Sequence, residues 1–308
     1  MSPVLDAPAA PRPAPPPLPP GELAALHGLT AVGARPPLGR YLAELWRRRH
    51  FVTALASARL AARYSRDRLG QLWQVLTPLL NAAVYYLVFG QLMGAGHAVP
   101  DYVPFLVTGV FVFTFTQACV MAGTRAISGQ RPLVRALHFP RAALPVALCL
   151  QQFRQLLFSM GVLIAIVLMS GVPPTPHWIL AVPALLLQAL FNTGLALAVA
   201  RAAARTPDLA QLMPFVLRTW MYASGVMFAL HRLGDRHEIP AWVPTALQCN
   251  PTAVYIDLVR YALIDSFRDD PATHLPPHIW TLALGWALLA LVGGFVLFWQ
   301  AEESYGRD

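Results

Sequence analysis

The chain has 308 residues, of which 56% are hydrophobic and only 12% are charged. Soluble domains carry roughly 25% charged residues, so this chain lacks the polar surface it would need in water unless lipid covers much of its outside. The composition largely excludes a soluble globular protein and predicts an integral membrane protein. All 23 basic residues are arginine. Without a lysine the chain cannot form a Walker A phosphate loop, and it cannot hydrolyse ATP by that route.

The first part of the chain predicts a tail followed by an amphipathic helix. Residues 1–38 contain a proline-rich run, and we expect a disordered cytoplasmic tail there. Between residues 39 and 70, apolar residues and arginines alternate at roughly helical spacing, which favours a helix lying in the membrane interface. A solvated basic helix is the alternative. The candidate interface residues are Trp46, Arg47, Arg48, Arg49 and Phe51.

Residues 71–300 contain a series of long apolar stretches. About 20 helical residues cross the ~30 Å hydrocarbon core of a bilayer, and each stretch is long enough to do so. We therefore expect an all-α membrane domain with six transmembrane helices, followed by a cytoplasmic tail at 301–308. The predicted spans are 72–93, 103–122, 142–169, 178–200, 209–230 and 279–299.

The distribution of arginine predicts the orientation in the membrane. If both termini lie on one side, that side holds 17 arginines outside the spans and the opposite side holds four. Because short cytoplasmic loops are enriched in arginine and lysine, we expect both termini in the cytoplasm. All four outer arginines lie within residues 231–277, a segment too long for a plain connection.

Charged residues inside the predicted spans are few. Arg154 and Arg218 are the only ones, and no aspartate or glutamate occurs there. Ion-coupled carriers usually need a carboxylate near the membrane midplane, so ion-driven transport loses support. Because an arginine facing lipid is costly, we expect both arginines to face protein, water or headgroups.

Several aromatic residues in the spans suit a path for sugar chains. Aromatic faces stack on the apolar surface of sugar rings, and tyrosine hydroxyls add hydrogen bonds. Packing or interfacial anchoring is the alternative for each of them. The candidate channel-lining residues are Tyr85, Tyr86, Trp220 and Tyr222. The cysteines and histidines lack the spacing of a metal site, and we expect none.

Ordered motifs across residues 40–300 are similar to those of one transporter family. The stretch from Arg63 to Trp73, continued by Tyr85–Gly90, resembles the permease subunit of polysaccharide-exporting ABC transporters, the ABC-2 type family that exports O-antigen, capsule, teichoic acid and galactan. Phe139-Pro140-Arg141 resembles that family's segment between the second and third spans, and Asn250-Pro251 resembles its motif before the last span. The chain departs from the pattern at Gly225, where the family often has proline.

The resemblance implies an architecture and partners. It implies a homodimer of six-span subunits in the bacterial inner (cytoplasmic) membrane, each docked on a separate ATPase subunit that binds ATP and Mg²⁺. This chain would be a transport subunit without catalytic activity or a bound cofactor. The family's coupling helix would cover residues 124–136. The ATPase-coupling residues that the resemblance implies are Arg125, Arg131, Arg135, Phe139, Pro140 and Arg141.

The resemblance also implies re-entrant helices that close the outer mouth. Residues 239–246 and 252–264 fit such helices, with a solvated loop as the alternative. Asn250, Pro251 and Tyr255 are the candidate gate residues.

The leading hypothesis is ATP-driven export of a lipid-linked polysaccharide or glycan-phosphate polymer. Its partners would be the ATPase subunit, a second copy of this chain, the lipid-linked glycan and membrane lipids, and we expect no nucleic acid. The first alternative is an ABC-2 type drug or lipid exporter. A membrane-embedded sugar transferase would need clustered acids, and Asp265, Asp269 and Asp270 lie on the side away from nucleotide-sugar donors. A purely structural membrane protein is a further alternative.

Overall fold

The computed structural model describes residues 26, 36–64, 70–94, 99–130, 139–230, 240, 242–270, 275–276 and 278–302. The chain divides into a unit of residues 1–34 and a unit of residues 35–308, and the second contains the helical bundle. The predicted tail at 1–38 lies outside the described residues except for Leu26 and residues 36–38, and the tail at 301–308 is described only at Ala301 and Glu302.

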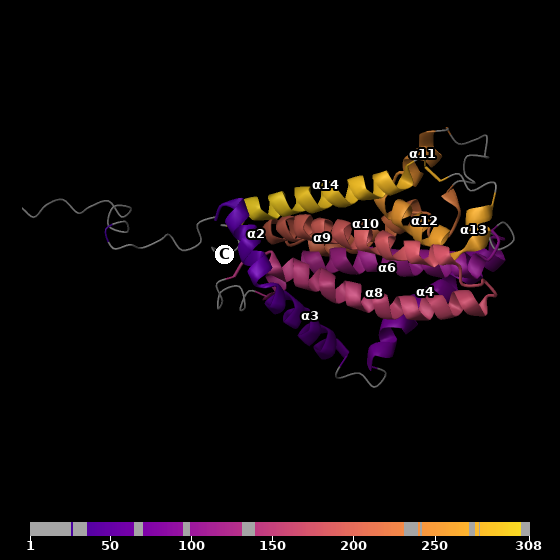
Figure 1. Ribbon diagram of the computed structural model, residues 1–308, viewed down its shortest axis with the longest axis horizontal. Helices are drawn as coiled ribbons and strands as arrows, with labels where there is room; N and C mark the ends of the chain where they lie inside the picture. Colours follow the sequence, from indigo (N-terminus) through magenta and orange to yellow (C-terminus); the bar gives the residue numbers. More distant parts are fainter. Residues whose placement is uncertain are drawn as a thin grey trace, which may run out of the picture. The chain divides into compact units, whose positions relative to one another are not determined.

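Long apolar helices lie side by side in the bundle (Figure 1). Among the described residues five helical segments are long and apolar enough to cross a membrane, and no β-strand occurs. The predicted all-α polytopic membrane protein is confirmed. The segments are α4 (Trp73–Tyr85) continued by the π-helix η2 (Tyr86–Leu92), α6 (Tyr102–Thr124), α8 (Ala143–Met169), α9 (Ala181–Arg205) preceded by the 3-10 helix η4 (Pro176–Leu180), and α14 (Ile279–Gln300).

The predicted span at 209–230 is shorter than expected. Helix α10 covers only Leu209–Ala223, which is about 22 Å at 1.5 Å per residue and falls short of the ~30 Å core. The helix ends because Gly225 adopts a φ of +63°, a left-handed conformation that favours glycine. Proline, whose ring holds φ near −65°, could not stand there, which accounts for the departure from the family pattern. After Gly225 the backbone turns inward, and Val226 and Met227 are buried.

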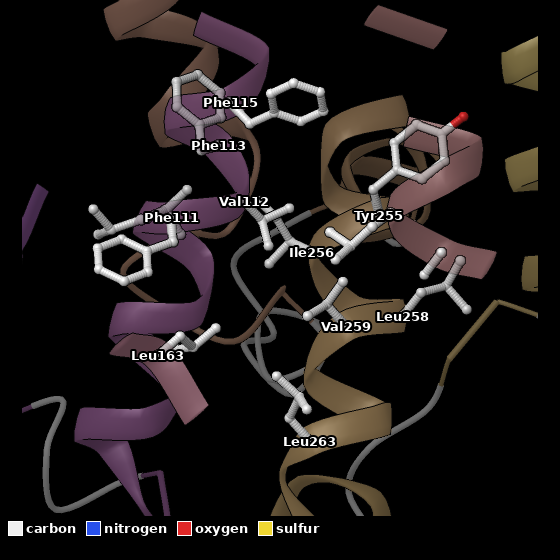
Figure 2. Packing of buried hydrophobic residues seen from close by; sticks show 14 of the residues in the cluster. Phe111, Val112, Phe113, Phe115, Leu163, Tyr255, Ile256, Leu258, Val259 and Leu263 are labelled. Atoms are coloured by element: carbon white, nitrogen blue, oxygen red, sulfur yellow. The ribbon is translucent and has the colours of Figure 1, made fainter. Parts of the chain in front are cut away.

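A short buried helix occupies the segment predicted to be re-entrant. Helix α12 (Pro251–Leu263) is almost wholly buried and packs against α6, α9 and α14. Figure 2 shows Val112 of α6 and Ile256 of α12 facing each other across this contact. The short helices α11 (Trp242–Gln248) and α13 (Asp265–Asp269) flank α12 at the same end of the bundle, here termed the α12 end (Figure 1). Ile239, the expected start of the first re-entrant helix, lies outside the described residues.

Two helices stand where one amphipathic helix was predicted. Helix α2 (Leu38–Arg47) and helix α3 (Arg49–Tyr64) are separated by a turn at Arg48. Tyr41 of α2 is buried, whereas α3 packs along α8. The two helices therefore lie on different surfaces of the bundle. A single straight helix over 39–70 could not bury Tyr41 and also pack along α8.

The segment predicted as a coupling helix does not begin as an α-helix. After α6 ends at Thr124, residues 125–127 form a turn and the 3-10 helix η3 covers Ser128–Gln130. Residues 131–138, with Arg131 and Arg135, lie outside the described residues. The turn lies at the end of the bundle that carries α2, here termed the α2 end, since Ala126 and Ile127 pack in one cluster with Tyr41.

Glycine allows α9 and α14 to touch backbone to backbone. A Cβ atom added to Gly294 would lie 1.9 Å from the carbonyl oxygen of Gly194, and one added to Gly194 would lie 2.2 Å from the carbonyl group of Ala290. Since hydrocarbon gives little driving force between helices, such close packing is a main source of membrane-protein stability.

Gly294→Ala should therefore destabilise the protein, because the methyl group forces the two helices apart. Overpacking of this kind costs about 1–3 kcal/mol, and thermal unfolding of the detergent-purified chain should show a lower Tm. Gly293→Ala is the matched control, because an added Cβ at Gly293 has no atom within 4 Å. Equal Tm values for the two variants would contradict the close contact.

Candidate functional site

A buried hydrogen-bond cluster joins three segments at the α2 end. The hydroxyl of Tyr41 in α2 donates to Oε2 of Glu302 at 2.8 Å and accepts from the backbone N–H of Ala142 at 3.1 Å. The backbone N–H of Arg141 donates to Oε1 of Glu302 at 3.1 Å, and the Arg141 guanidinium donates to the Glu302 carbonyl oxygen. The cluster therefore fastens α2, the segment before α8 and the end of α14 to one another.

Glu302 is the acceptor at the centre of this cluster. Burial raises the pKa of its carboxyl, while the hydrogen bonds from Arg141 and Tyr41 oppose the rise because they favour the ionised form. Neither Tyr41 nor Glu302 was expected from the sequence. An acidic residue directly after the last span offers no signal of burial, because its partners are more than 160 positions away.

The predicted coupling motif lies against the predicted interface helix. The ring of Phe139 packs on that of Phe51 in α3, with centroids 5.3 Å apart, and Pro140 is buried beside it. Arg125 is exposed on the turn after α6. The structure thus places Phe139 against Phe51 and Arg141 at Glu302, and leaves Arg125 exposed.

Helix α2 carries an exposed apolar stripe beside the buried Tyr41. Leu38, Leu42 and Trp46 follow one another at helical spacing, and Trp46 is 71% exposed. The guanidinium of Arg49 lies 5.5 Å from the Trp46 ring centroid. Arg47 is exposed as well, and Arg48 pairs with Glu44 at 3.4 Å. Exposed apolar and basic side chains in this order suit a helix at a lipid surface, so the interface role stays a prediction with a fitting geometry.

Two of the predicted channel residues, Tyr85 and Tyr222, lie near each other where α4 meets α10. The Tyr85 hydroxyl lies 3.8 Å from Sδ of Met221, and Tyr85 interacts electrostatically with Tyr222 and Arg218. Tyr222 and Arg218 are both exposed. We term this surface, formed by Tyr85, Arg218 and Tyr222, the α4/α10 face.

Arg218 places a charge on the α4/α10 face. It lies in the middle of α10, where a lipid-facing arginine costs about 2.5–3.5 kcal/mol. The other arginine of the spans, Arg154, is bound by protein instead, since its guanidinium donates to the Ser57 hydroxyl of α3. The exposed Arg218 therefore fits a face that meets water, headgroups or a second protein surface better than one that meets hydrocarbon.

Trp220 belongs to a polar cluster at the start of α12. Its indole N–H donates to Oδ1 of Asn250 at 2.8 Å. Asn250 also caps α12 by accepting from the N–H of Thr252 and donates to the carbonyl oxygen of Ala223 at 3.1 Å. The cluster joins the end of α10 to the beginning of α12, with Pro251 as the first helical residue. A predicted channel residue and a predicted gate residue are thus hydrogen-bonded to each other.

Tyr86 and Tyr255 have other surroundings. Tyr86 accepts a hydrogen bond from Gln91 at 2.8 Å and borders a hollow that also contains Asp101 and Tyr102. Tyr255 is fully buried, and its hydroxyl donates to the Ala283 carbonyl oxygen of α14 at 2.8 Å. Tyr255 therefore anchors α12 within the bundle. As a predicted gate residue, it would support α12 from behind and would not line the mouth.

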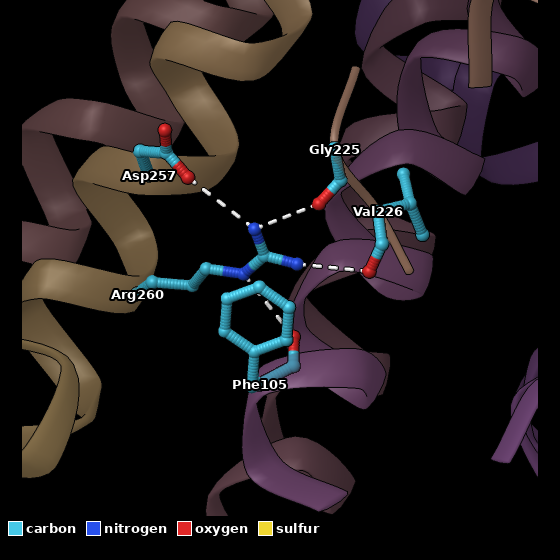
Figure 3. A network of polar contacts seen from close by, with 5 residues as sticks. All are labelled: Phe105, Gly225, Val226, Asp257 and Arg260. Atoms are coloured by element: carbon cyan, nitrogen blue, oxygen red, sulfur yellow. Dashed lines mark hydrogen bonds and ion pairs between the residues drawn. The ribbon is translucent and has the colours of Figure 1, made fainter. Parts of the chain in front are cut away.

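Arg260 is a charged residue whose position the sequence did not indicate. It was counted with the outer loop, yet it is 1% exposed in the middle of α12. Its guanidinium donates to the carbonyl oxygens of Phe105, Gly225 and Val226 and to Asp257 (Figure 3). Within the described residues, no group of three histidine, cysteine or acidic side chains is placed to hold a metal ion.

Comparison with known proteins agrees with this architecture. Residues 51–264 match the family model described as "ABC-2 type transporter". The chain is 28% identical over 196 residues to the O-antigen export system permease protein RfbA of Myxococcus xanthus, which covers 64% of this chain and 75% of that protein. It is 23% identical over 198 residues to a protein of the same name from Klebsiella pneumoniae, covering 64% and 73% of the two chains.

Tyr41→Phe should weaken the cluster at the α2 end. Without the hydroxyl, the buried N–H of Ala142 and one oxygen of Glu302 lose a partner, which costs about 1–3 kcal/mol. Thermal unfolding of the purified chain in detergent measures the loss. Tyr222→Phe is the control, because Tyr222 is exposed. If both variants unfold at the wild-type temperature, the cluster does not contribute to stability.

Proposed function

Because this chain belongs to the ABC-2 type transporter family, we propose that it is the permease of an ATP-driven exporter, and that its substrate is a lipid-linked polysaccharide or glycan-phosphate polymer crossing the bacterial cytoplasmic membrane. The names of the relatives support a polysaccharide substrate over the drug or lipid alternative. The chain has no lysine for a Walker A loop, so ATP and Mg²⁺ bind to a separate ATPase subunit.

The observation that carries the proposal is the exposed arginine of the α4/α10 face. A second copy of this chain placed against this face would enclose a path between the two subunits. Arg218 would then meet water and substrate, with Tyr85 and Tyr222 beside it to stack on sugar rings. The exposed apolar residues Leu212 and Phe215 of α10 would lie at the margins of the same interface.

The α2 end is the cytoplasmic end in this proposal, because the arginine-rich segments lie there. The ATPase subunit docks on the turn at Arg125 and on the following segment with Arg131 and Arg135. Movement of this segment reaches Phe139, Pro140 and Arg141. The contacts of Phe139 with Phe51, of the adjacent Ala142 with Tyr41 and of Arg141 with Glu302 pass it to α3, α2 and α14.

The α12 end then faces the outside, and both termini lie in the cytoplasm. Helices α11, α12 and α13 close the outer mouth of the path, and the polar cluster of Asn250 ties this closure to α10. Substrate that moves along α10 would reach Trp220 and Asn250 last.

Co-purification tests the proposal most directly. The tagged chain, extracted in detergent, should bring down an ATPase subunit in equal amount, and the complex should hydrolyse ATP. A strain that lacks this chain should lose its surface glycan, and a plasmid-borne copy of the gene should restore that glycan. This result would identify the class of the exported molecule. Recovery of the chain alone, as a stable particle without ATPase activity, would contradict the proposal.

Thiol labelling tests the path itself. In a chain whose native cysteines are replaced, Tyr222→Cys should react with a charged, membrane-impermeant thiol reagent, because it faces water in the assembled dimer. Leu289→Cys is the matched control. Leu289 is 65% exposed on α14, yet it should face lipid and stay unlabelled. Equal labelling at both positions in proteoliposomes would contradict the proposal that the α4/α10 face lines the export path.

A further inference from the structure

The broken end of α10 leaves backbone carbonyl groups that no helix satisfies. Side chains from two other helices bind them. Asn250 donates to the carbonyl oxygen of Ala223, and Tyr102 of α6 donates to that of Met227 at 2.9 Å. The carbonyl oxygens of Gly225 and Val226, between these two, are each bound by Arg260 at 2.9 Å.

Arg260 binds α6 and its own helix at the same time. Its Nε donates to the Phe105 carbonyl oxygen at 3.2 Å, and its Nη1 lies 3.3 Å from Asp257, one turn earlier in α12. The guanidinium carbon lies 3.4 Å from the centroid of the Phe105 ring. Gly109 leaves the room that this requires, since a Cβ atom there would lie 2.6 Å from Nη2 of Arg260.

We propose that Arg260 is a positioning residue of the outer mouth, which holds the broken end of α10, the start of α6 and the re-entrant helix α12 together as one rigid unit. The inference rests on the proposed function, in which the α12 end closes the export path. Opening then moves α10 and α12 together, and the contact between them never separates.

The guanidinium of arginine is better suited than any other side-chain group to binding these four acceptors at once. Three carbonyl oxygens and a carboxylate surround it, and its donors are fixed in a plane that reaches them together. The single amine of lysine cannot reach all of these groups. Asp257 balances the charge, so the buried pair is neutral as a whole.

A disulfide tether tests the rigid unit. Oγ of Ser224 at the end of α10 lies 2.5 Å from Oγ1 of Thr252 in α12, so Ser224→Cys and Thr252→Cys place two thiols within disulfide reach. With the native cysteines replaced, the oxidised pair should leave the ATPase rate of the transporter complex unchanged, because α10 and α12 need not part. A complex that stalls on oxidation and recovers on reduction would overturn the proposal.

Leakage through the mouth tests Arg260 itself. Proteoliposomes with the Arg260→Met permease and entrapped carboxyfluorescein should leak about tenfold faster than wild type or more, because without these charge-assisted hydrogen bonds the end of α10 and α12 can part and leave a gap in the mouth. Arg260→Lys should leak to an intermediate extent. Arg268→Met is the matched control, since Arg268 lies at the same end and forms ion pairs with Asp265 and Asp269. It should stay as tight as wild type.

Combining the two changes separates positioning from folding. In Arg260→Met, oxidation of the Ser224→Cys and Thr252→Cys pair should restore a tight mouth, and reduction should reopen it. A well-assembled Arg260→Met permease that is as tight as wild type, or one whose leak the tether does not reduce, would overturn the inference. The leak assay needs no ATPase subunit, so these results are independent of the co-purification that tests the proposed function.

Discussion

A backbone that breaks inside a membrane protein must find partners for its carbonyl groups, because the hydrocarbon offers none. Helix α10 ends at Ala223, well before a full membrane crossing, and each buried carbonyl left unpaired would cost about 1–3 kcal/mol. Arg260 and its neighbours satisfy these groups from α12 and α6. The hydrogen bonds that offset the cost of the break also fix the position of α12. The short helices of the α12 end thus exist in this arrangement because α10 stops early.

A second buried hydrogen-bond cluster holds the α2 end together, with an acidic acceptor at its centre where the α12 end has a basic donor. There an acidic residue, Glu302, accepts the hydrogen bonds, and the donors are Tyr41 and the backbone and side chain of Arg141. Both clusters join segments far apart in the sequence, and both lie where helices end. Long apolar helices gain their register from close packing, and hydrogen bonds between them add to it. Buried polar groups with defined partners fix the register at each end of the bundle.

The sequence predicts the parts of this protein that depend on local composition. Five of the six predicted spans and the helical, basic nature of the segment predicted at 39–70 follow from hydropathy and arginine spacing, whereas the helices near Asn250 follow from the family resemblance. It does not predict what depends on distant partners. The early end of α10 follows from the positive φ of Gly225. The φ of a glycine inside an apolar stretch cannot be predicted from the sequence. The burial of Arg260 cannot be predicted from the sequence, because it depends on carbonyl groups that only the fold brings together. For the channel residues, the meeting of Tyr85 with Tyr222 could not be read from their spacing.

Helix α6 connects the two ends. It extends from Tyr102 to Thr124, about 35 Å at 1.5 Å per residue, and it is the most deeply buried of the spans. One end leads into the turn at Arg125, and the other supplies the Phe105 carbonyl that Arg260 binds. Most of α6 is packed against other helices, and it resists bending because a bend would open cavities along its length. In the proposed function, a push at the α2 end would therefore displace the whole helix toward the α12 end. Because Arg260 joins α6 to both α12 and the end of α10, the outer mouth would then respond as a unit.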